Sequence, residues 1–220
     1  MKTVKISNSY KINKNIIKKT AELISEGKIA ILPTGTIYGL SCKYNDRNAK
    51  LKAQTKKKRS KNLPFIILIS SHDDFKSLVS DINPAAKKII KNFWDIENPK
   101  PLTLIFNKRD SLENFITSGS SNIAIRLAYP GFLRNIIKIC GPIVSTSATV
   151  SGTKSHSKKI EDIPAAIREQ ADLIVEYPSS LTGVESTIVD VTGQTPVLVR
   201  KGKVKFKDVL RFRSSKKKLT

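Results

Sequence analysis

Cysteine and histidine are scarce in this chain, and their scarcity excludes two kinds of site. The cysteines are Cys42 and Cys140 and the histidines are His72 and His156, two of each among 220 residues. None of them stand at the spacing of metal ligands, so no structural zinc site and no protein-bound zinc are predicted. Two cysteines in a chain of this length are typical of reduced thiols in the cytosol, and a disulfide framework is not predicted.

Long hydrophobic runs are also lacking. No run approaches the ~18 apolar residues of a membrane-spanning helix. The N-terminal segment MKTVKISNSY has no apolar core of signal-peptide length. We therefore expect a cytoplasmic protein without a membrane partner.

Acidic residues are few, and three segments have almost none. The chain has 40 Lys and Arg against 18 Asp and Glu, a formal net charge of +22. Residues 1–20 and 50–61 contain no acid, and residues 201–220 contain Asp208 alone. Such a chain is drawn to polyanions, so contact with tRNA or another structured RNA is one interpretation. A general preference for lysine at plain surface positions is the other, and the charge alone does not choose between them.

Apolar residues make up 39% of the chain, which is enough to bury a core. Short apolar runs alternate with amphipathic stretches, and this alternation predicts an α/β protein with a mixed sheet and helices on both sides. Strands are predicted at 29–33, 65–69, 102–106, 123–127, 143–145, 172–176, 187–191 and 197–200. Helices are predicted at 13–26, after Asp46, near 73–80, at 84–93, 132–140 and 160–170, and in the basic last twenty residues.

Four apolar strands each adjoin a polar turn rich in hydroxyl groups or ending in arginine. The most informative turn is 32–40, which holds two threonines, a tyrosine and two glycines, and the cationic cluster 56–59 follows about twenty residues later. The other three segments are 122–126, 145–149 and 183–187. Hydroxyl and backbone N–H groups at strand ends can hold a phosphate or carboxylate, and an arginine can grip a carboxylate through two hydrogen bonds. Each turn alone is also compatible with ordinary capping chemistry, but their recurrence favours a site for an anionic small molecule.

These segments resemble the motifs of the YrdC/TsaC family of L-threonylcarbamoyladenylate synthases. The resemblance runs from about residue 13 to about residue 203. It rests on Pro33-Thr34-x-Thr36-x-Tyr38-Gly39-Leu40, Lys57-x-Arg59, Pro101-Leu102-Thr103-Leu104, Ala124-Ile125-Arg126, Ser145-Thr146-Ser147-Ala148, Gly183-Val184-Glu185-Ser186-Thr187 and Val199-Arg200-x-Gly202.

The resemblance implies a fold, a reaction and partners. The fold is a twisted open α/β sheet around a concave, positively charged cavity. The reaction joins L-threonine, bicarbonate or CO2, and ATP into L-threonylcarbamoyl-AMP and releases pyrophosphate. The product serves the downstream threonylcarbamoyl-transferase machinery, which modifies adenosine beside the anticodon of ANN-decoding tRNA. Mg²⁺ is expected with ATP, although no all-protein magnesium site is found.

The resemblance also implies roles for individual residues. Lys57 and Arg59 are the catalytic cations, and they face the phosphates of ATP. Threonine is held by Thr36, Arg126, Ser147 and Ser186, with Arg126 on its carboxylate. The remaining contacts with ATP come from Asn122, Thr149, Ser155 and Arg200.

Some positions depart from the family pattern. Thr149 stands where the family usually has asparagine, which removes an amide from a nucleotide contact. Ser60 replaces a common proline, Gly35 replaces a common acidic residue, and Leu63 and Leu68 stand where some members are polar. None of these changes removes the cations expected to hold the phosphates.

The predicted organisation is a YrdC-like catalytic domain over 1–203 followed by a basic helix and tail over 204–220, the short type without a second domain. An alternative is a YrdC-like module that binds RNA and performs no chemistry. The related domain of hydrogenase maturation proteins is a third possibility, but those proteins carry zinc-finger cysteine clusters that this chain lacks.

Overall fold

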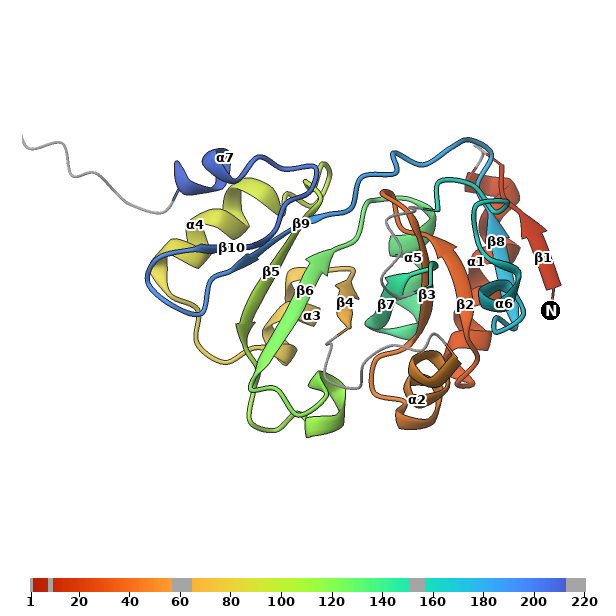
Figure 1. The fold of residues 1–220 in the computed structure, drawn as a ribbon, viewed down its shortest axis with the longest axis horizontal. Helices are drawn as coiled ribbons and strands as arrows, with labels where there is room; N and C mark the ends of the chain where they lie inside the picture. Colours follow the sequence, from red (N-terminus) through yellow and green to blue (C-terminus); the bar gives the residue numbers. More distant parts are fainter. Residues whose placement is uncertain (1, 8–9, 57–64, 151–156, 213–220) are drawn as a thin grey trace, which may run out of the picture.

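The computed structural model describes residues 2–7, 10–56, 65–150 and 157–212. These residues form a mixed, open, twisted sheet of ten strands with helices on both faces (Figure 1). The strand order is β1-β8-β2-β3-β7-β4-β6-β5-β9-β10. The predicted α/β class with flanking helices is therefore confirmed.

The strands pair in both directions, and most neighbours in the sheet are distant in sequence. Their bounds are β1 (Lys2–Lys5), β2 (Ala30–Pro33), β3 (Tyr38–Lys43), β4 (Ile66–Ile69), β5 (Leu102–Asn107), β6 (Asn122–Leu127), β7 (Ile143–Ser147), β8 (Leu173–Glu176), β9 (Thr187–Asp190) and β10 (Val197–Arg200).

The helices are short apart from the first. Their bounds are α1 (Tyr10–Ser25), α2 (Arg47–Lys56), α3 (His72–Leu78), α4 (Pro84–Phe93), the 3-10 helix η1 (Asn114–Thr117), α5 (Phe132–Cys140), α6 (Ala165–Arg168) and α7 (Phe206–Leu210).

Three predicted helix boundaries are confirmed by their hydrogen bonds. α1 ends in a Schellman motif, in which Gly27 has φ +77° and its N–H donates to the Ile24 carbonyl. Asp46 caps α2 by accepting from the Ala49 N–H at 2.9 Å. Asn83 does the same for α4 through the Ala86 N–H at 2.8 Å.

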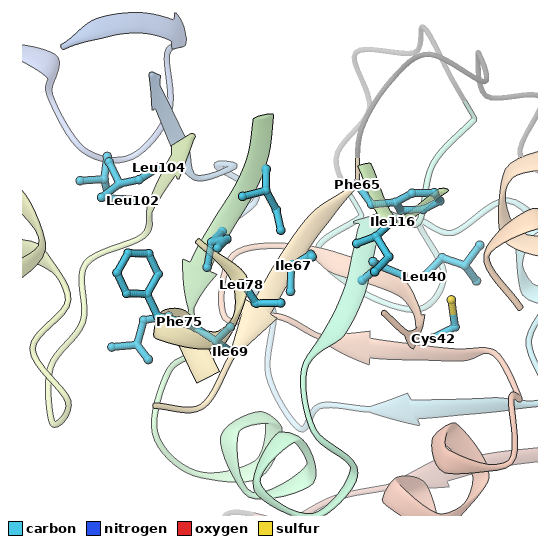
Figure 2. Packing of buried hydrophobic residues seen from close by; sticks show 14 of the residues in the cluster. Leu40, Cys42, Phe65, Ile67, Ile69, Phe75, Leu78, Leu102, Leu104 and Ile116 are labelled. Carbon is cyan, nitrogen blue, oxygen red and sulfur yellow. The ribbon is translucent and has the colours of Figure 1, made fainter. Parts of the chain in front are cut away.

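Alternate residues of the strands supply two cores, one on each face of the sheet. Ile29, directly before β2, and Ile31 of β2 belong to the larger core, whereas Ala30 and Leu32 of β2 belong to the smaller one. The smaller core is completed mainly by α1 and α5. Figure 2 shows part of the larger core, with side chains that include Phe65, Ile67, Ile69, Phe75 and Leu78.

Two strands were not predicted. β3 begins within the stretch 32–40 that was interpreted as a turn, and it was missed because its hydroxyls and glycine do not form an apolar run. Only 34–37 form the loop, and β3 then returns antiparallel to β2. β1 is an edge strand with two lysines, and it pairs in parallel with β8, some 170 residues away. The helix predicted over 160–170 is limited to α6, since Pro164 stands at its N-cap.

The two basic ends of the described chain do not meet. β1 and α7 lie at opposite ends of the molecule (Figure 1), next to opposite edges of the sheet. α7 packs on the larger core through Val209, which is fully buried. The basic segments therefore do not make one continuous surface through these two elements.

Candidate active site

The loop between β2 and β3 forms one wall of the site. Thr34 closes this loop, because its N–H donates to the Ile37 carbonyl at 3.1 Å and its hydroxyl donates to the same oxygen at 2.7 Å. Gly35 has φ +81°, and a Cβ there would lie 2.2 Å from the Tyr129 ring. A glycine is therefore required both by the backbone conformation and by the tyrosine that covers it.

Arg126 lies at the centre of the site. It is on β6, and its side chain is on the opposite face from Ile125, which belongs to the larger core. Its Nη1 donates to Thr36 Oγ1 at 3.3 Å and its Nη2 donates to the Thr34 carbonyl at 3.0 Å. Its Nε is buried and has no hydrogen-bond partner among the described residues. The protein therefore does not use all five donors of this guanidinium.

Burial disfavours the positive charge of Arg126. Desolvation lowers the pKa of Arg126 to about 10, and the positive charge of Arg200 acts in the same direction. Tyr129 and Glu185 act the other way, but they do not overcome the desolvation. No carboxylate in the described chain forms an ion pair with Arg126. A bound anion would therefore find a cation that the protein leaves largely uncompensated.

Arg200 forms the opposite wall together with Glu185 and Ser186. Its Nη1 pairs with Glu185 Oε2 at 2.8 Å, and its Nη2 donates to the Ser186 carbonyl at 2.9 Å and to Ser186 Oγ at 3.2 Å. Ser186 Oγ also shares a hydrogen bond with Thr103 Oγ1 at 2.8 Å. Burial lowers the pKa of Arg200, and the Glu185 carboxylate opposes that shift.

Gly202 allows the segments of this wall to pack closely. A Cβ on Gly202 would lie 2.4 Å from the Ser186 carbonyl carbon and the Thr187 nitrogen, which are backbone atoms. The adjacent Lys203 N–H donates to the Glu185 carbonyl at 3.0 Å. Only glycine lets the turn after β10 approach the start of β9 this closely, and this approach positions Arg200.

The crossing from β8 to β9 joins the two walls. It runs over the top of the sheet in the view of Figure 1 and connects strands near opposite ends of the sheet. The Gly183 N–H donates to the Thr36 carbonyl at 3.0 Å, and the Thr182 hydroxyl donates to the same oxygen at 3.3 Å. The loop 34–37, which accepts hydrogen bonds from Arg126, is thus hydrogen-bonded to the segment that carries Glu185 and Ser186.

Between the walls lies a cavity of about 130 Å³. This is several times the roughly 30 Å³ that one water occupies in the liquid, so a small polar molecule fits. The cavity is lined by hydroxyls, two arginines, one carboxylate and a few apolar groups: Thr34, Thr36, Ile37, Gly39, Ile66, Leu68, Arg126, Ser145, Thr146, Ser147, Glu185, Ser186, Ile188 and Arg200.

The structure brings five of the predicted site residues together in this lining, namely Thr36, Arg126, Ser147, Ser186 and Arg200. Thr149 is buried beside the cavity, where its hydroxyl shares a hydrogen bond of 3.0 Å with Ser147 Oγ, but it is not part of the described lining.

Asn122 lies at the start of β6, paired in register with Asn107 and four residues before Arg126, and it too is not part of that lining. Lys57, Arg59 and Ser155 lie outside the described residues. Their predicted roles therefore stay predictions.

Sequence reasoning did not assign Glu185 or Thr34 to the site. Glu185 belongs to a motif that the sequence singled out, but its contact with Arg200 joins segments whose proximity depends on the pairing of β9 with β10. Thr34 acts on Arg126 through its backbone carbonyl, which no side-chain pattern indicates. A larger cavity of about 470 Å³ lies on the other side of Thr34 and Gly35, and its described lining contains no charged side chain.

The fold is thus an open α/β sheet of ten strands with a cavity lined by hydroxyls and two arginines. The family model Sua5/YciO/YrdC, described as "Telomere recombination", matches residues 22–202. The chain belongs to this family.

Individual relatives agree with this assignment. The chain is 30% identical over 208 residues to a threonylcarbamoyl-AMP synthase from Pyrococcus abyssi, covering 94% of this chain and 60% of the relative. It is 26% identical to a putative threonylcarbamoyl-AMP synthase from Methanocaldococcus jannaschii, covering 94% of this chain and 97% of that one. The chain thus spans about 60% of the length of the Pyrococcus relative and nearly all of the Methanocaldococcus one.

Solved structures agree in fold. P. abyssi Sua5 complexed with L-threonine superposes with a TM-score of 0.83 at 29% identity, over 96% of this chain and 59% of that one. Escherichia coli YciO superposes with a TM-score of 0.81 over 94% of this chain and 98% of that one, but at 22% identity it bears on the fold alone.

Proposed function

We propose that this chain makes L-threonylcarbamoyl-AMP from L-threonine, bicarbonate or CO2, and ATP, with release of pyrophosphate. The observation that carries the proposal is Arg126, a buried arginine with an unpartnered Nε beside a cavity lined by hydroxyls. The names of the relatives and the L-threonine complex of P. abyssi Sua5 support the same reading.

In this proposal Arg126 binds the carboxylate of threonine, and the hydroxyls of Thr36, Ser147 and Ser186 surround the rest of the molecule. The ammonium group loses a proton to solvent, and the free amine forms an N–C bond to CO2, supplied directly or from bicarbonate by loss of water. The nitrogen then releases a second proton to solvent, and an oxygen of the resulting carbamate attacks the α-phosphorus of ATP. A bond from that oxygen to phosphorus forms, the bond from the α-phosphorus to the bridging oxygen breaks, and pyrophosphate leaves. This is nucleotidyl transfer.

The reactants are anions, so the protein's main task is to hold them together against repulsion. Arg200 lies in the cavity wall, and Lys57 and Arg59 are predicted to join it on the phosphates. Fixed cations stabilise the charge that develops on the leaving pyrophosphate, and positioning supplies most of the remaining catalysis.

Mg²⁺ is proposed to arrive with ATP. The described residues contain no group of three or more acidic, histidine or cysteine side chains able to hold a metal. The carboxylate in the cavity, Glu185, is engaged by Arg200. The donor set therefore does not fit an all-protein magnesium site, and no step is assigned to the ion.

The product would serve the threonylcarbamoyl modification of ANN-decoding tRNA beside the anticodon, through downstream transferase machinery. A cytoplasmic location is part of the proposal. Within the described residues no helix has the length and apolarity to cross a membrane. Direct contact with tRNA is part of the proposal, and the net charge of +22 supports it.

Pyrophosphate release by the purified protein tests the proposal. ATP and bicarbonate are supplied without amino acid, with L-threonine, and with L-serine as the control. We expect release that requires threonine and far exceeds the release with serine. No release from a folded protein that binds RNA would instead favour the RNA-binding module, for which Thr149 in place of the family's asparagine is the motivation.

A further inference from the structure

Glu185 is the one acidic side chain in the described lining of the cavity. Every other ionised group there is an arginine, and the rest of the lining is hydroxyl or apolar. A site that binds only phosphates and carboxylates gains nothing from a carboxylate, because like charges repel. The presence of Glu185 therefore needs a cationic partner, and Arg200 accounts for only part of it.

One oxygen of the Glu185 carboxylate forms an ion pair, and the other does not. Its Oε2 binds Arg200 Nη1 at 2.8 Å, whereas Oε1 has no hydrogen-bond partner within the described chain. The backbone of Glu185 is fixed by the Lys203 N–H at 3.0 Å. The side chain of Glu185 is 22% exposed and is therefore partly buried.

An amino acid brings two opposite charges into this cavity. The Arg126 guanidinium suits the carboxylate, but the α-ammonium also loses its water on entry and requires an acceptor. Hydroxyls can accept hydrogen bonds from it, but a carboxylate offers the stronger, charge-assisted bond. Glu185 and Arg126 are close enough for the charge of one to act on the other.

Building on the proposed function, we propose that Glu185 binds the α-ammonium group of the amino-acid substrate while it keeps its hold on Arg200. Its two oxygens allow both contacts at once. Arg126 and Glu185 then form a pair of opposite charges that selects a zwitterion, and the cavity discriminates an amino acid from the corresponding hydroxy acid.

Calorimetric titration with two ligands tests this. One is L-threonine, and the other is 2,3-dihydroxybutanoate of matching configuration, in which a hydroxyl replaces the ammonium group. The wild-type protein should prefer threonine by about 10- to 100-fold, the range expected for one charge-assisted contact. In Glu185→Gln that preference should fall to within about threefold, mainly because threonine binds more weakly.

Two further variants separate this role from a structural one. Glu22→Gln removes the same charge from the exposed face of α1, where Glu22 pairs with Lys18 at 3.8 Å, and should leave the preference unchanged. Glu185→Asp keeps the charge on a shorter side chain and should retain part of the preference. Matching circular dichroism and melting temperatures establish that the variants are folded.

The outcomes distinguish the two proposals. If Glu185→Gln keeps the full preference for threonine and weakens only ATP binding, Glu185 merely tethers Arg200 and the inference is wrong. That result leaves the synthase proposal standing, provided the wild type still releases pyrophosphate with threonine. If the wild type binds neither ligand and releases no pyrophosphate, the proposed function itself fails and the inference fails with it.

Discussion

At the scale of single residues, the charge of Arg126 opposes folding but is expected to serve binding. Folding lowers its pKa to about 10, so the protonated form is less favoured in the folded than in the unfolded protein. At neutral pH its charge therefore opposes folding, and deprotonation would relieve this only as the pH rises through about 10. A charge kept at such a cost is expected to serve binding.

Replacing Arg126 with methionine should separate these two effects. Arg126→Met removes a buried charge that has no ion-pair partner, so we expect an unfolding free energy equal to or above that of the wild type. Threonine-dependent pyrophosphate release should fall by roughly 100-fold or more, because the carboxylate loses its cation. Urea unfolding and the release assay measure the two effects.

Arg126→Lys is the matched variant, because it keeps the charge and loses the planar fork. It should recover less than about a tenth of the wild-type activity. A methionine variant that stays active, or that unfolds much more easily than wild type, would contradict the role given to Arg126.

Gly202 is the second residue with a sharp expectation. Gly202→Ala places a Cβ 2.4 Å from backbone atoms of Ser186 and Thr187, so the two segments must separate. We expect a loss of about 1–3 kcal/mol in unfolding free energy and a raised KM for ATP, because Arg200 moves with the turn.

Gly193 provides the control for this substitution. A Cβ on Gly193 meets nothing within 4 Å, so Gly193→Ala should change the unfolding free energy by less than about 0.5 kcal/mol. If Gly202→Ala and Gly193→Ala lowered the unfolding free energy equally, the close backbone contact at Gly202 would not be the cause of the loss.

At the scale of elements, α2 is attached to η1 by a buried lysine. Lys50 is 3% exposed, and its ammonium donates to the carbonyls of Phe115 and, at 2.8 Å, Ile116. It also lies over the rings of Phe65 and Phe115, at 5.6 and 5.9 Å. Because α2 leads directly into the segment with Lys57 and Arg59, this attachment sets where that segment begins.

Removing the ammonium of Lys50 should loosen this attachment. Lys50→Ala removes the ammonium donor from the Phe115 and Ile116 carbonyls, of which Phe115 keeps the Ser118 N–H, and leaves a space among the aromatic rings. We therefore expect a loss of about 2–4 kcal/mol in unfolding free energy. Lys52→Ala, on the exposed side of the same helix, should cost less than about 0.5 kcal/mol. Comparable losses in the two variants would refute the anchoring role.

The elements also show what the sequence could predict. Apolar runs such as 65–69 and capping residues such as Asn83 act locally, so the strands and helices they predict were found. β1 was missed because it becomes a strand only by pairing with β8, far along the chain. β3 was missed because its hydroxyls and glycine do not form an apolar run.

The residues of the site likewise divide into those predicted from motifs and those brought together by strand pairing. Arg126 and the hydroxyls were predicted from motifs, whereas the Glu185–Arg200 pair depends on how β9 and β10 pair. The order of strands in the sheet is likewise set by packing between segments far apart in the chain.

At the scale of the whole molecule, two of the basic elements that the structure describes lie far apart. β1 lies at one end of the molecule and α7 at the other (Figure 1). RNA should therefore bind through scattered phosphate contacts with little sequence preference and a steep dependence on salt.

Fluorescence anisotropy with tRNA and with an unrelated RNA of equal length measures this. Affinities for the two RNAs should agree within about tenfold, and both should fall by roughly 10²-fold or more between 50 and 200 mM salt. Lys203→Gln with Lys205→Gln and Lys207→Gln should reduce the salt slope without abolishing binding. Strong, salt-resistant preference for tRNA would instead indicate a dedicated recognition surface.

The crossing from β8 to β9 has a consequence for how the protein is made. One wall of the cavity is encoded at residues 34–37 and the other at residues 185–200, so a growing chain carries the first wall long before the second exists. Domains acquire structure during synthesis in the order in which their segments emerge. Ribosome-bound chains that lack β10 also lack Arg200, so the lining of the cavity is complete only after β10 has been made.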